Sequence, residues 1–287
     1  WLIAQARTKE VLVIQVWMNG LNIVLDLLYV LEFQWGVSGV AWATFIAEWS
    51  GAALGLWFCR GVLGRPNWNR WVRVFDRVRL MNMARVNSDI LIRSVLLEAS
   101  FVSFLFWGGD FGDVELAANQ ILLQFLHVTA YALDGFAFAA EAIVAQALGA
   151  RNRPLLRKGA LMTTAWGAGL SAALGIIFLV FGPSIIDLMA KSEDVREVAR
   201  VYLIYMVIAP FVGAYAWMLD GIFIGATQSR DMRNMMVVSA TVYFVAAALL
   251  VPSFQNHGLW VCLLISFIVR GITLGIRYPR IEARAGA

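Results

Sequence analysis

Residues 12–31 read LVIQVWMNGLNIVLDLLYVL, a run in which most side chains are apolar and one is charged. Its length fits an α-helix that crosses the roughly 30 Å hydrocarbon core of a bilayer. The charged residue is Asp26, and an ionised carboxylate near the middle of such a helix costs roughly 2.5–3.5 kcal/mol on insertion scales. The stretch therefore predicts a transmembrane helix that has a reason to keep an acid.

The composition of the whole chain points to a membrane protein. Of its 287 residues, 61% are hydrophobic and 15% are charged, and the mean hydropathy is +0.72. A soluble domain is typically about 25% charged. Residues 159–181 and 234–255 contain no charged side chain at all. We therefore expect an all-α integral membrane protein with the lipid bilayer as its main partner.

Eight membrane spans are predicted, at residues 11–33, 36–59, 90–107, 116–148, 159–181, 201–225, 232–251 and 258–276. Lys and Arg gather in the connections on one side of these spans, and the connections on the other side are acidic or neutral. Cytoplasmic connections carry the excess of Lys and Arg, so both ends of this chain are expected in the cytoplasm. The net charge of +4 is thus a signal of topology, and no nucleic-acid partner is expected.

The longest basic connection, residues 61–86, is expected to be a cytoplasmic linker between two parts, residues 1–60 and 87–287. Its sequence WNRWVRVFDRVRLMNMARV, residues 68–86, is typical of an amphipathic helix on the membrane surface. The chain starts at Trp1 with what resembles the end of a helix, so we expect that an N-terminal portion precedes it.

Polar residues recur at helical spacing within two of the spans. The first span carries Gln15, Asn19, Asn22, Asp26 and Tyr29, and the fourth carries Gln120, Gln124, His127, Tyr131, Asp134 and Glu141. At about 100° per residue each set falls on one face of its helix. Such a face is expected to border a water-filled cavity or the bundle interior. Hydrogen bonding between helices is the alternative role, but an acid is a costly residue for that purpose.

Thr44 is expected to lie near the acid of the first span. The first two spans are antiparallel and joined by a tight turn near residues 34–36, and Asp26 and Thr44 each lie about two helical turns from it. Asn22, Asp26 and Thr44 together offer an amide oxygen, a carboxylate and a hydroxyl. These are hard ligands suited to Na⁺, or partners for a carboxyl group that takes up a proton.

Other charged residues also lie within spans. Glu98 is at mid-span in LLEASFV, and Asp220 is nearer the basic end of WMLDGIF. Arg93 lies close enough to the end of its span for its guanidinium to reach the interface. Glu48 and Arg270 could either pair across helices or support the bundle, and the sequence does not decide between these roles.

Motifs of enzymes are absent from the sequence. There is no H-E-x-x-H or G-x-S-x-G, and the only two histidines, His127 and His257, are far apart. The two cysteines, Cys59 and Cys262, fall in spans and are expected to be small apolar residues rather than a disulfide or a metal pair. We therefore expect no enzyme and no resident cofactor.

Several stretches resemble the multidrug and toxic compound extrusion (MATE) family. They are NIVLDLLYV (22–30), WGVSGVAWATFIAEW (35–49), LLEASFV (96–102), GDVELAANQILLQFL (112–126), AYALDGFAFAAEAIVAQALGARNR (130–153) and GIFIGATQSRDMRN (221–234). The resemblance implies two six-helix lobes around a central cavity. The eight spans would be the last two helices of the first lobe and all six of the second.

The resemblance also implies a function. The family exports cationic or amphipathic compounds in exchange for H⁺ or Na⁺ by alternating access, here as a monomer in the plasma (inner) membrane of a bacterium. Asn22, Asp26 and Thr44 match a first-lobe cation site, whose other acid would lie on a helix outside this chain. Glu98 and Asp220 resemble acids of a neighbouring branch. Asp134 and Glu141, with their stripe, would line the second-lobe cavity.

The hypothesis that follows makes Asp26 a coupling switch. Protonation or Na⁺ binding would remove its charge, allow neighbouring helices to repack, and lower the affinity for a cationic substrate. A flippase for a lipid-linked precursor is the alternative within the same superfamily. Such a cavity is expected to carry several Arg or Lys for pyrophosphate, whereas the spans here carry more acids.

Overall fold

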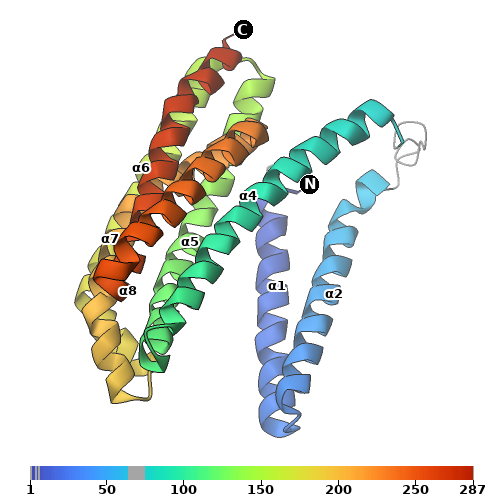
Figure 1. Ribbon diagram of the computed structural model, residues 1–287. Helices are drawn as coiled ribbons and strands as arrows, with labels where there is room; N and C mark the ends of the chain where they lie inside the picture. Colours follow the sequence, from blue (N-terminus) through green and yellow to red (C-terminus); the bar gives the residue numbers. More distant parts are fainter. Residues whose placement is uncertain (1, 4, 6, 64–74, 287) are drawn as a thin grey trace. The chain divides into compact units, whose positions relative to one another are not determined.

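The computed structural model describes residues 2, 3, 5, 7–63 and 75–286, and in this part of the chain every regular element is a helix. The prediction of an all-α protein is confirmed. The chain divides into two compact units, Trp1–Leu80 and Met81–Ala287 (Figure 1), which we call the N-terminal and the C-terminal unit.

The N-terminal unit is a helical hairpin. Helix α1 (Thr8–Asp26) continues into a short π-helix, η1 (Leu27–Glu32), and the chain then reverses into α2 (Gly36–Leu63). Gln34 and Gly36 adopt φ values of 55° and 54° in the turn, a left-handed conformation that is easiest for glycine. Ala43, Ala47 and Gly51 form the buried face of α2, with Gly51 against Met18 of α1. The predicted turn at residues 34–36 is confirmed.

The C-terminal unit contains long helices joined by tight turns. They are α4 (Arg77–Gly109, most of which belongs to this unit), α5 (Asp113–Gly149), α6 (Arg153–Met189), α7 (Glu193–Gly225) and α8 (Ser229–Ala285). Asn152 caps α6 by accepting a hydrogen bond from the backbone N–H of Leu155 at 2.9 Å. Pro154 in the first turn of α6 needs no hydrogen-bond acceptor there.

Helix α8 is itself a hairpin of two helices. Its only non-helical residue is Gln255 (φ 48°, ψ −130°), which lies in the predicted connection between the last two spans. Ser239 Oγ donates to the carbonyl oxygen of Ser266 at 2.7 Å, and Arg277 pairs with Asp231 at 3.4 Å. These contacts run in opposite directions along the chain, so the two halves are antiparallel.

Six of the described helical segments are long and apolar enough to cross a membrane: Thr8–Glu32, α4, α5, α6, α7 and α8. Since α8 contains two of the predicted spans, these segments account for seven of the eight. The remaining predicted span, residues 36–59, lies within α2, which contains Glu48 and several Gly, Ser and Trp residues and is not among these six segments. The chain is a multi-pass membrane protein.

Close contact between backbones joins α5 and α7. A Cβ atom on Gly221 would lie 2.4 Å from the carbonyl oxygen of Ala137, and one on Gly225 would lie 2.3 Å from that of Glu141. Small residues permit this approach, which is a common packing mode of helices in membranes. The position of α7 against α5 therefore depends on two glycines that are one helical turn apart.

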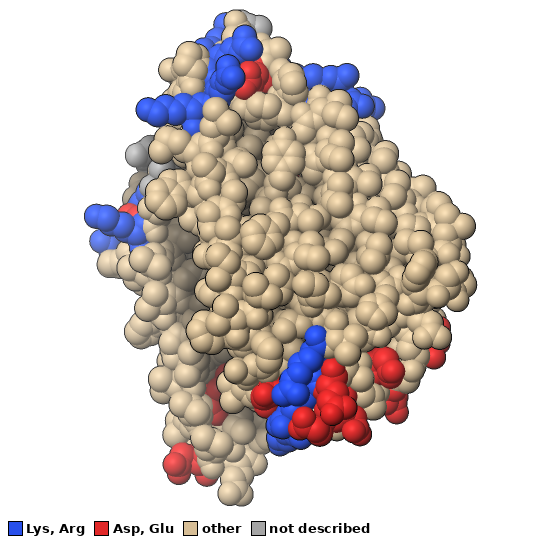
Figure 2. Space-filling view, turned by 90° about the vertical axis from the view of Figure 1, so that its left-hand side faces the viewer, with Lys and Arg blue, Asp and Glu red and all other residues tan. Residues whose placement is uncertain are grey.

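Charged side chains of the C-terminal unit gather at its two ends. Figure 2 shows most Lys and Arg atoms toward the top, Asp and Glu atoms mainly toward the bottom, and a broad uncharged band between them. In the C-terminal unit the basic end includes Arg85, Arg157 and Arg230, and the acidic end includes Asp113 and Glu193. This is the asymmetry that the positive-inside rule uses.

Part of the predicted linker is helical in the structure. Residues 64–74 lie outside the described residues, and with them the first part of the amphipathic pattern. Arg77 and the residues that follow it to Val86 form the first turns of α4, continuous with the helix that contains the third predicted span. The division into units falls within this range, after Leu80.

Candidate functional site

Two of the three predicted cation ligands are in contact in the N-terminal unit. Asn22 Nδ2 donates a hydrogen bond to Thr44 Oγ1 at 3.4 Å, across the interface of α1 and α2. This bond leaves the amide oxygen of Asn22 for another partner. The turn at residues 34–36 sets the pairing of the two helices and so brings these side chains to one level.

Asp26 lies one helical turn beyond Asn22, at the last residue of α1. Its Oδ1 atom is shielded from solvent and has no hydrogen-bond partner among the described residues. A buried polar atom without a partner is rare in proteins because its desolvation is not compensated. A proton on the carboxyl group, or a cation beside it, would remove this cost.

The helix changes its hydrogen-bond pattern directly after Asp26. Residues Leu27–Glu32 form a π-helix, in which the backbone N–H of Phe33 donates to the carbonyl oxygen of Leu28, five residues earlier, at 3.0 Å. Short π-helical segments within α-helices occur frequently at functional sites. Tyr29 lies within this segment and is half-buried like Asn22 and Asp26. Its ring stacks on Trp35, with ring centroids 5.0 Å apart.

The polar stripe of α5 lies on the side of the helix away from the core of the C-terminal unit. Gln120, Gln124 and Tyr131 are exposed, whereas the buried face of α5 contains residues such as Leu122 and Leu133. The other members of the stripe, His127, Asp134 and Glu141, are half-buried. The three exposed residues thus lie outside the core of this unit, and their place beside a cavity or within the full bundle stays a prediction.

A buried cluster of charges contains Asp220. Arg93 Nη2 of α4 donates to Asp220 Oδ2 of α7 at 2.5 Å, and Arg270 Nη2 of α8 lies 3.5 Å from the same oxygen. Asp220 is 6% exposed and Arg270 is 3% exposed. The expectation that Arg93 extends to the interface is wrong, because this ion pair holds its guanidinium against α7. The sequence left two roles open for Arg270, and the structure shows that it pairs across helices with Asp220.

Asp134 and Glu98 have different relations to this cluster. Asp134 on the accessible side of α5 interacts electrostatically with Asp220 and Arg93. With Asp134 included, the group contains two carboxylates and two guanidinium groups, and their formal charges cancel. Glu98 is exposed on α4 and makes no ion pair in the described part of the chain. The structure therefore does not bring Glu98 and Asp220 together as a pair.

Two further polar clusters were missed at the level of sequence. Ser229 Oγ donates to Asp89 Oδ2 at 3.1 Å, and Arg233 also pairs with Asp89. The polar residues of this cluster lie at the predicted ends of spans, where polar residues are common. The sequence therefore offered no reason to single them out.

The other missed cluster lies at the opposite end of the unit. Asn119 and Asn256 exchange two hydrogen bonds, of 2.8 and 3.0 Å, and the indole N–H of Trp260 donates to Asn119. Asn119 is completely buried and its partner Asn256 follows the kink at Gln255. Asn119 lies beside Gln120 in the sequence but is buried, whereas Gln120 is exposed. A polar residue that falls outside the polar stripe of α5 was the available signal.

Comparison with known families gives a consistent result. The MatE family model matches residues 90–249. The chain is 36% identical to DNA damage-inducible protein F of Escherichia coli (strain K12), over 98% of this chain and 61% of the relative. It is 24% identical to a probable multidrug resistance protein NorM of Xylella fastidiosa (strain 9a5c), over 93% of this chain and 59% of the relative. The stretches 130–142 and 226–234 indicate the branch of DNA damage-inducible protein F.

A solved structure has a similar fold. The MATE transporter VcmN of Vibrio cholerae superposes with a TM-score of 0.86 at 17% identity, over 97% of this chain and 64% of that one. At this identity the likeness concerns the fold alone. The chain spans about three fifths of the length of the curated relatives named above.

Proposed function

The chain belongs to the MatE family, and from that premise we propose that it forms the larger part of a secondary active antiporter. In this proposal residues 1–60 supply the last two helices of the first lobe and residues 87–287 supply the second lobe, with residues 61–86 as a cytoplasmic linker. The transporter exports cationic or amphipathic compounds in exchange for H⁺ or Na⁺, as a monomer in the bacterial inner membrane with both ends of this chain in the cytoplasm.

The observation that carries the proposal is the state of Asp26. Its Oδ1 atom has no hydrogen-bond partner among the described residues, and Asn22 and Thr44 are hydrogen-bonded one turn away. A carboxylate, an amide oxygen and a hydroxyl are donors that Na⁺ accepts, and the carboxylate alone accepts a proton. Two helices that face each other thus offer the parts of a small coupling site.

The π-helix after Asp26 supports a mechanical link. Neutralising the carboxylate with a proton or Na⁺ changes the interactions at the end of α1, next to the six residues of η1. These residues can exchange their i→i+5 hydrogen bonds for α-helical ones, which rotates the end of the helix. We propose that this rotation couples ion uptake to a change in the cavity.

The substrate class in the proposal follows from the stripe of α5. Its accessible face presents Asp134 and Glu141 together with the amides of Gln120 and Gln124, the phenol of Tyr131 and the imidazole of His127. The exposed Glu98 adds another acid on α4. Acids favour a cationic compound, whereas the pyrophosphate of a lipid-linked precursor would need cations. Among the relatives, the name of the Xylella protein refers to multidrug resistance.

The test is efflux of a fluorescent cationic dye from proteoliposomes containing the full transporter to which this chain belongs. A pH gradient and a Na⁺ gradient are imposed separately on wild type, Asp26→Asn and Glu48→Gln. The last is the matched control, since Glu48 is an exposed acid on α2 of the same hairpin. We expect one gradient to drive efflux in wild type and in the control, with at least a tenfold loss in Asp26→Asn.

Two outcomes would contradict the proposal. Undiminished gradient-driven efflux in Asp26→Asn would show that this carboxylate does not couple ion and substrate. Absence of dye movement under either gradient would favour the lipid flippase and would leave Asp26 a structural role.

A further inference from the structure

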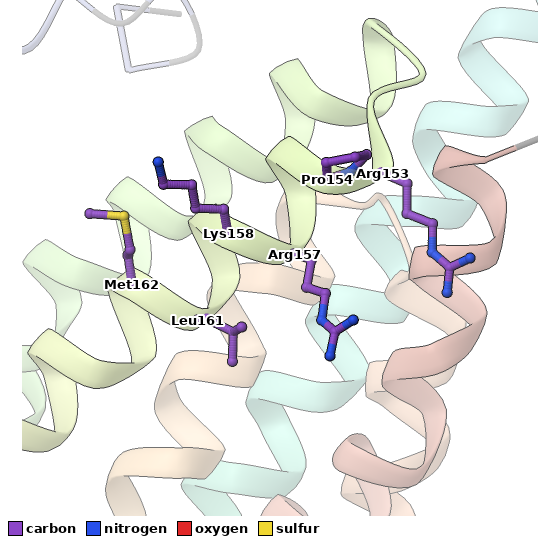
Figure 3. A pocket seen from close by; sticks show the side chains of 6 residues that line it. All are labelled: Arg153, Pro154, Arg157, Lys158, Leu161 and Met162. Carbon is purple, nitrogen blue, oxygen red and sulfur yellow. The ribbon is translucent and has the colours of Figure 1, made fainter.

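The first turns of α6 form an open hollow of about 510 Å³ on the surface of the C-terminal unit. Its lining combines cations with apolar side chains: Arg153, Pro154, Arg157, Lys158, Leu161 and Met162 (Figure 3). Figure 3 shows Arg153, Arg157 and Leu161 on one side of the helix and Lys158 and Met162 on the other. On each side, a cation is followed one helical turn later by an apolar side chain.

A second, narrower groove continues from this hollow. It has a volume of about 210 Å³, shares Arg157 and Leu161 with the hollow, and runs between α6, α7 and α8. Its lining continues through the apolar residues Ala160, Leu219 and Ile222 and also includes Thr164, Tyr215, Tyr278 and Glu282. The two cavities together form a basic entrance that leads into a mainly apolar groove between helices.

Of the three cations at this entrance, one has an acidic partner among the described residues and two do not. Arg157 and Lys158 are exposed, and neither forms an ion pair in the part of the chain that the structure describes. Arg153 pairs with Glu282 at 3.3 Å, so the negative charge of Glu282, the acid that lines the groove, is already compensated. The entrance therefore keeps an excess of two positive charges.

We propose that this composite cavity is a binding site for an anionic phospholipid. The phosphate lies between Arg157 and Lys158, with Arg153 at the rim, and one acyl chain follows Leu161 into the groove toward Ile222. Basic pockets between transmembrane helices on the cytoplasmic side recognise such head groups. A free phosphate would use the cations and leave the apolar groove empty, and a cationic substrate would be repelled from the entrance.

The test uses the chain purified in detergent and depleted of lipid. Native mass spectrometry follows the binding of a short-chain phosphatidylglycerol, with phosphatidylcholine of the same chain length and inorganic phosphate as comparison probes. Each Lys or Arg near such a site contributes about a fivefold change in affinity. We therefore expect Arg157→Gln/Lys158→Gln to bind phosphatidylglycerol about 30-fold more weakly.

The matched control removes two charges elsewhere at the same basic end. Arg85 and Arg230 are exposed and form no ion pair among the described residues, so Arg85→Gln/Arg230→Gln should bind within about twofold of wild type. An equal loss in this control would overturn the proposal in favour of general charge attraction. Equal binding of phosphatidylcholine would also overturn it, as would displacement of the lipid by inorganic phosphate, which would indicate a site for anions only.

Discussion

At the scale of single residues, Asp220 illustrates how a charge is kept within the membrane. Its carboxylate is shared by Arg93 and Arg270, and the contact with Arg270 is almost completely buried. Removing one member of a buried ion network is costly mainly because it leaves the other charges uncompensated. The role of Asp220 in the fold is therefore separable from any part in coupling.

We predict that Asp220→Asn lowers the free energy of unfolding by about 3–5 kcal/mol, since both guanidinium groups lose the carboxylate that they contact. Arg93→Gln should cost less, because Asp220 and Arg270 remain as a neutral pair. The measurement is the thermal unfolding temperature in detergent. Glu98→Gln is the control: this acid is exposed on α4, and its substitution should change stability by no more than about 0.5 kcal/mol. Equal unfolding temperatures for Asp220→Asn and Glu98→Gln would contradict the prediction.

At this scale sequence reasoning reaches furthest where local geometry decides. A short turn and the helical rise, both of which can be counted along the chain, predict Thr44 at the level of Asp26, and in the structure Thr44 contacts Asn22, one helical turn from Asp26. The π-helix of residues 27–32 was not predicted, because nothing in LLYVLE distinguishes a π-helix from an α-helix. The pairing of Arg93 with Asp220 spans 127 residues. Periodicity indicates which face of a helix is polar, but it does not identify the helix that packs there.

At the scale of elements, the close contact between α5 and α7 allows the packing of these two helices to be tested by substitution. Residue 221 approaches the backbone of Ala137, which cannot move without shifting the whole of α5. We predict that Gly221→Ala destabilises the chain by about 1–3 kcal/mol, the usual cost of overpacking. The measurement is again thermal unfolding in detergent.

Gly169 of α6 provides the control for this substitution. A Cβ atom there meets nothing within 4 Å, so Gly169→Ala should be neutral or should stabilise the helix by up to about 1 kcal/mol. The two substitutions are chemically identical and are predicted to have opposite signs. A stabilising effect of Gly221→Ala would show that α5 and α7 are further apart than the structure indicates.

The existence of the elements was easier to predict than their ends. The third predicted span covers residues 90–107, whereas α4 runs from Arg77 to Gly109. Hydropathy marks only the part of a helix that is immersed in lipid, and the helix continues into the polar region. Caps such as that of Asn152 on Leu155 fix the true ends through hydrogen bonds that an apolar pattern does not report.

At the scale of the whole molecule, the distribution of charge predicts the orientation in the membrane. Lys191 lies in the turn between α6 and α7 at the acidic end of the C-terminal unit, and Arg230 lies in the first turn of α8 at its basic end. Both are exposed. The positive-inside rule places the first outside the cytoplasm and the second within it.

We predict that labelling with a membrane-impermeant maleimide separates these two positions in bacterial spheroplasts. The background carries Cys59→Ala and Cys262→Ala, since both native cysteines are free thiols. Lys191→Cys should react in intact spheroplasts, whereas Arg230→Cys should react only after the membrane is permeabilised. Because α7 crosses the membrane between the two positions, labelling of both from outside would mean that α7 is not a span. The reverse pattern would place the basic end, with Arg157 and Lys158, away from the cytoplasm, against the positive-inside rule.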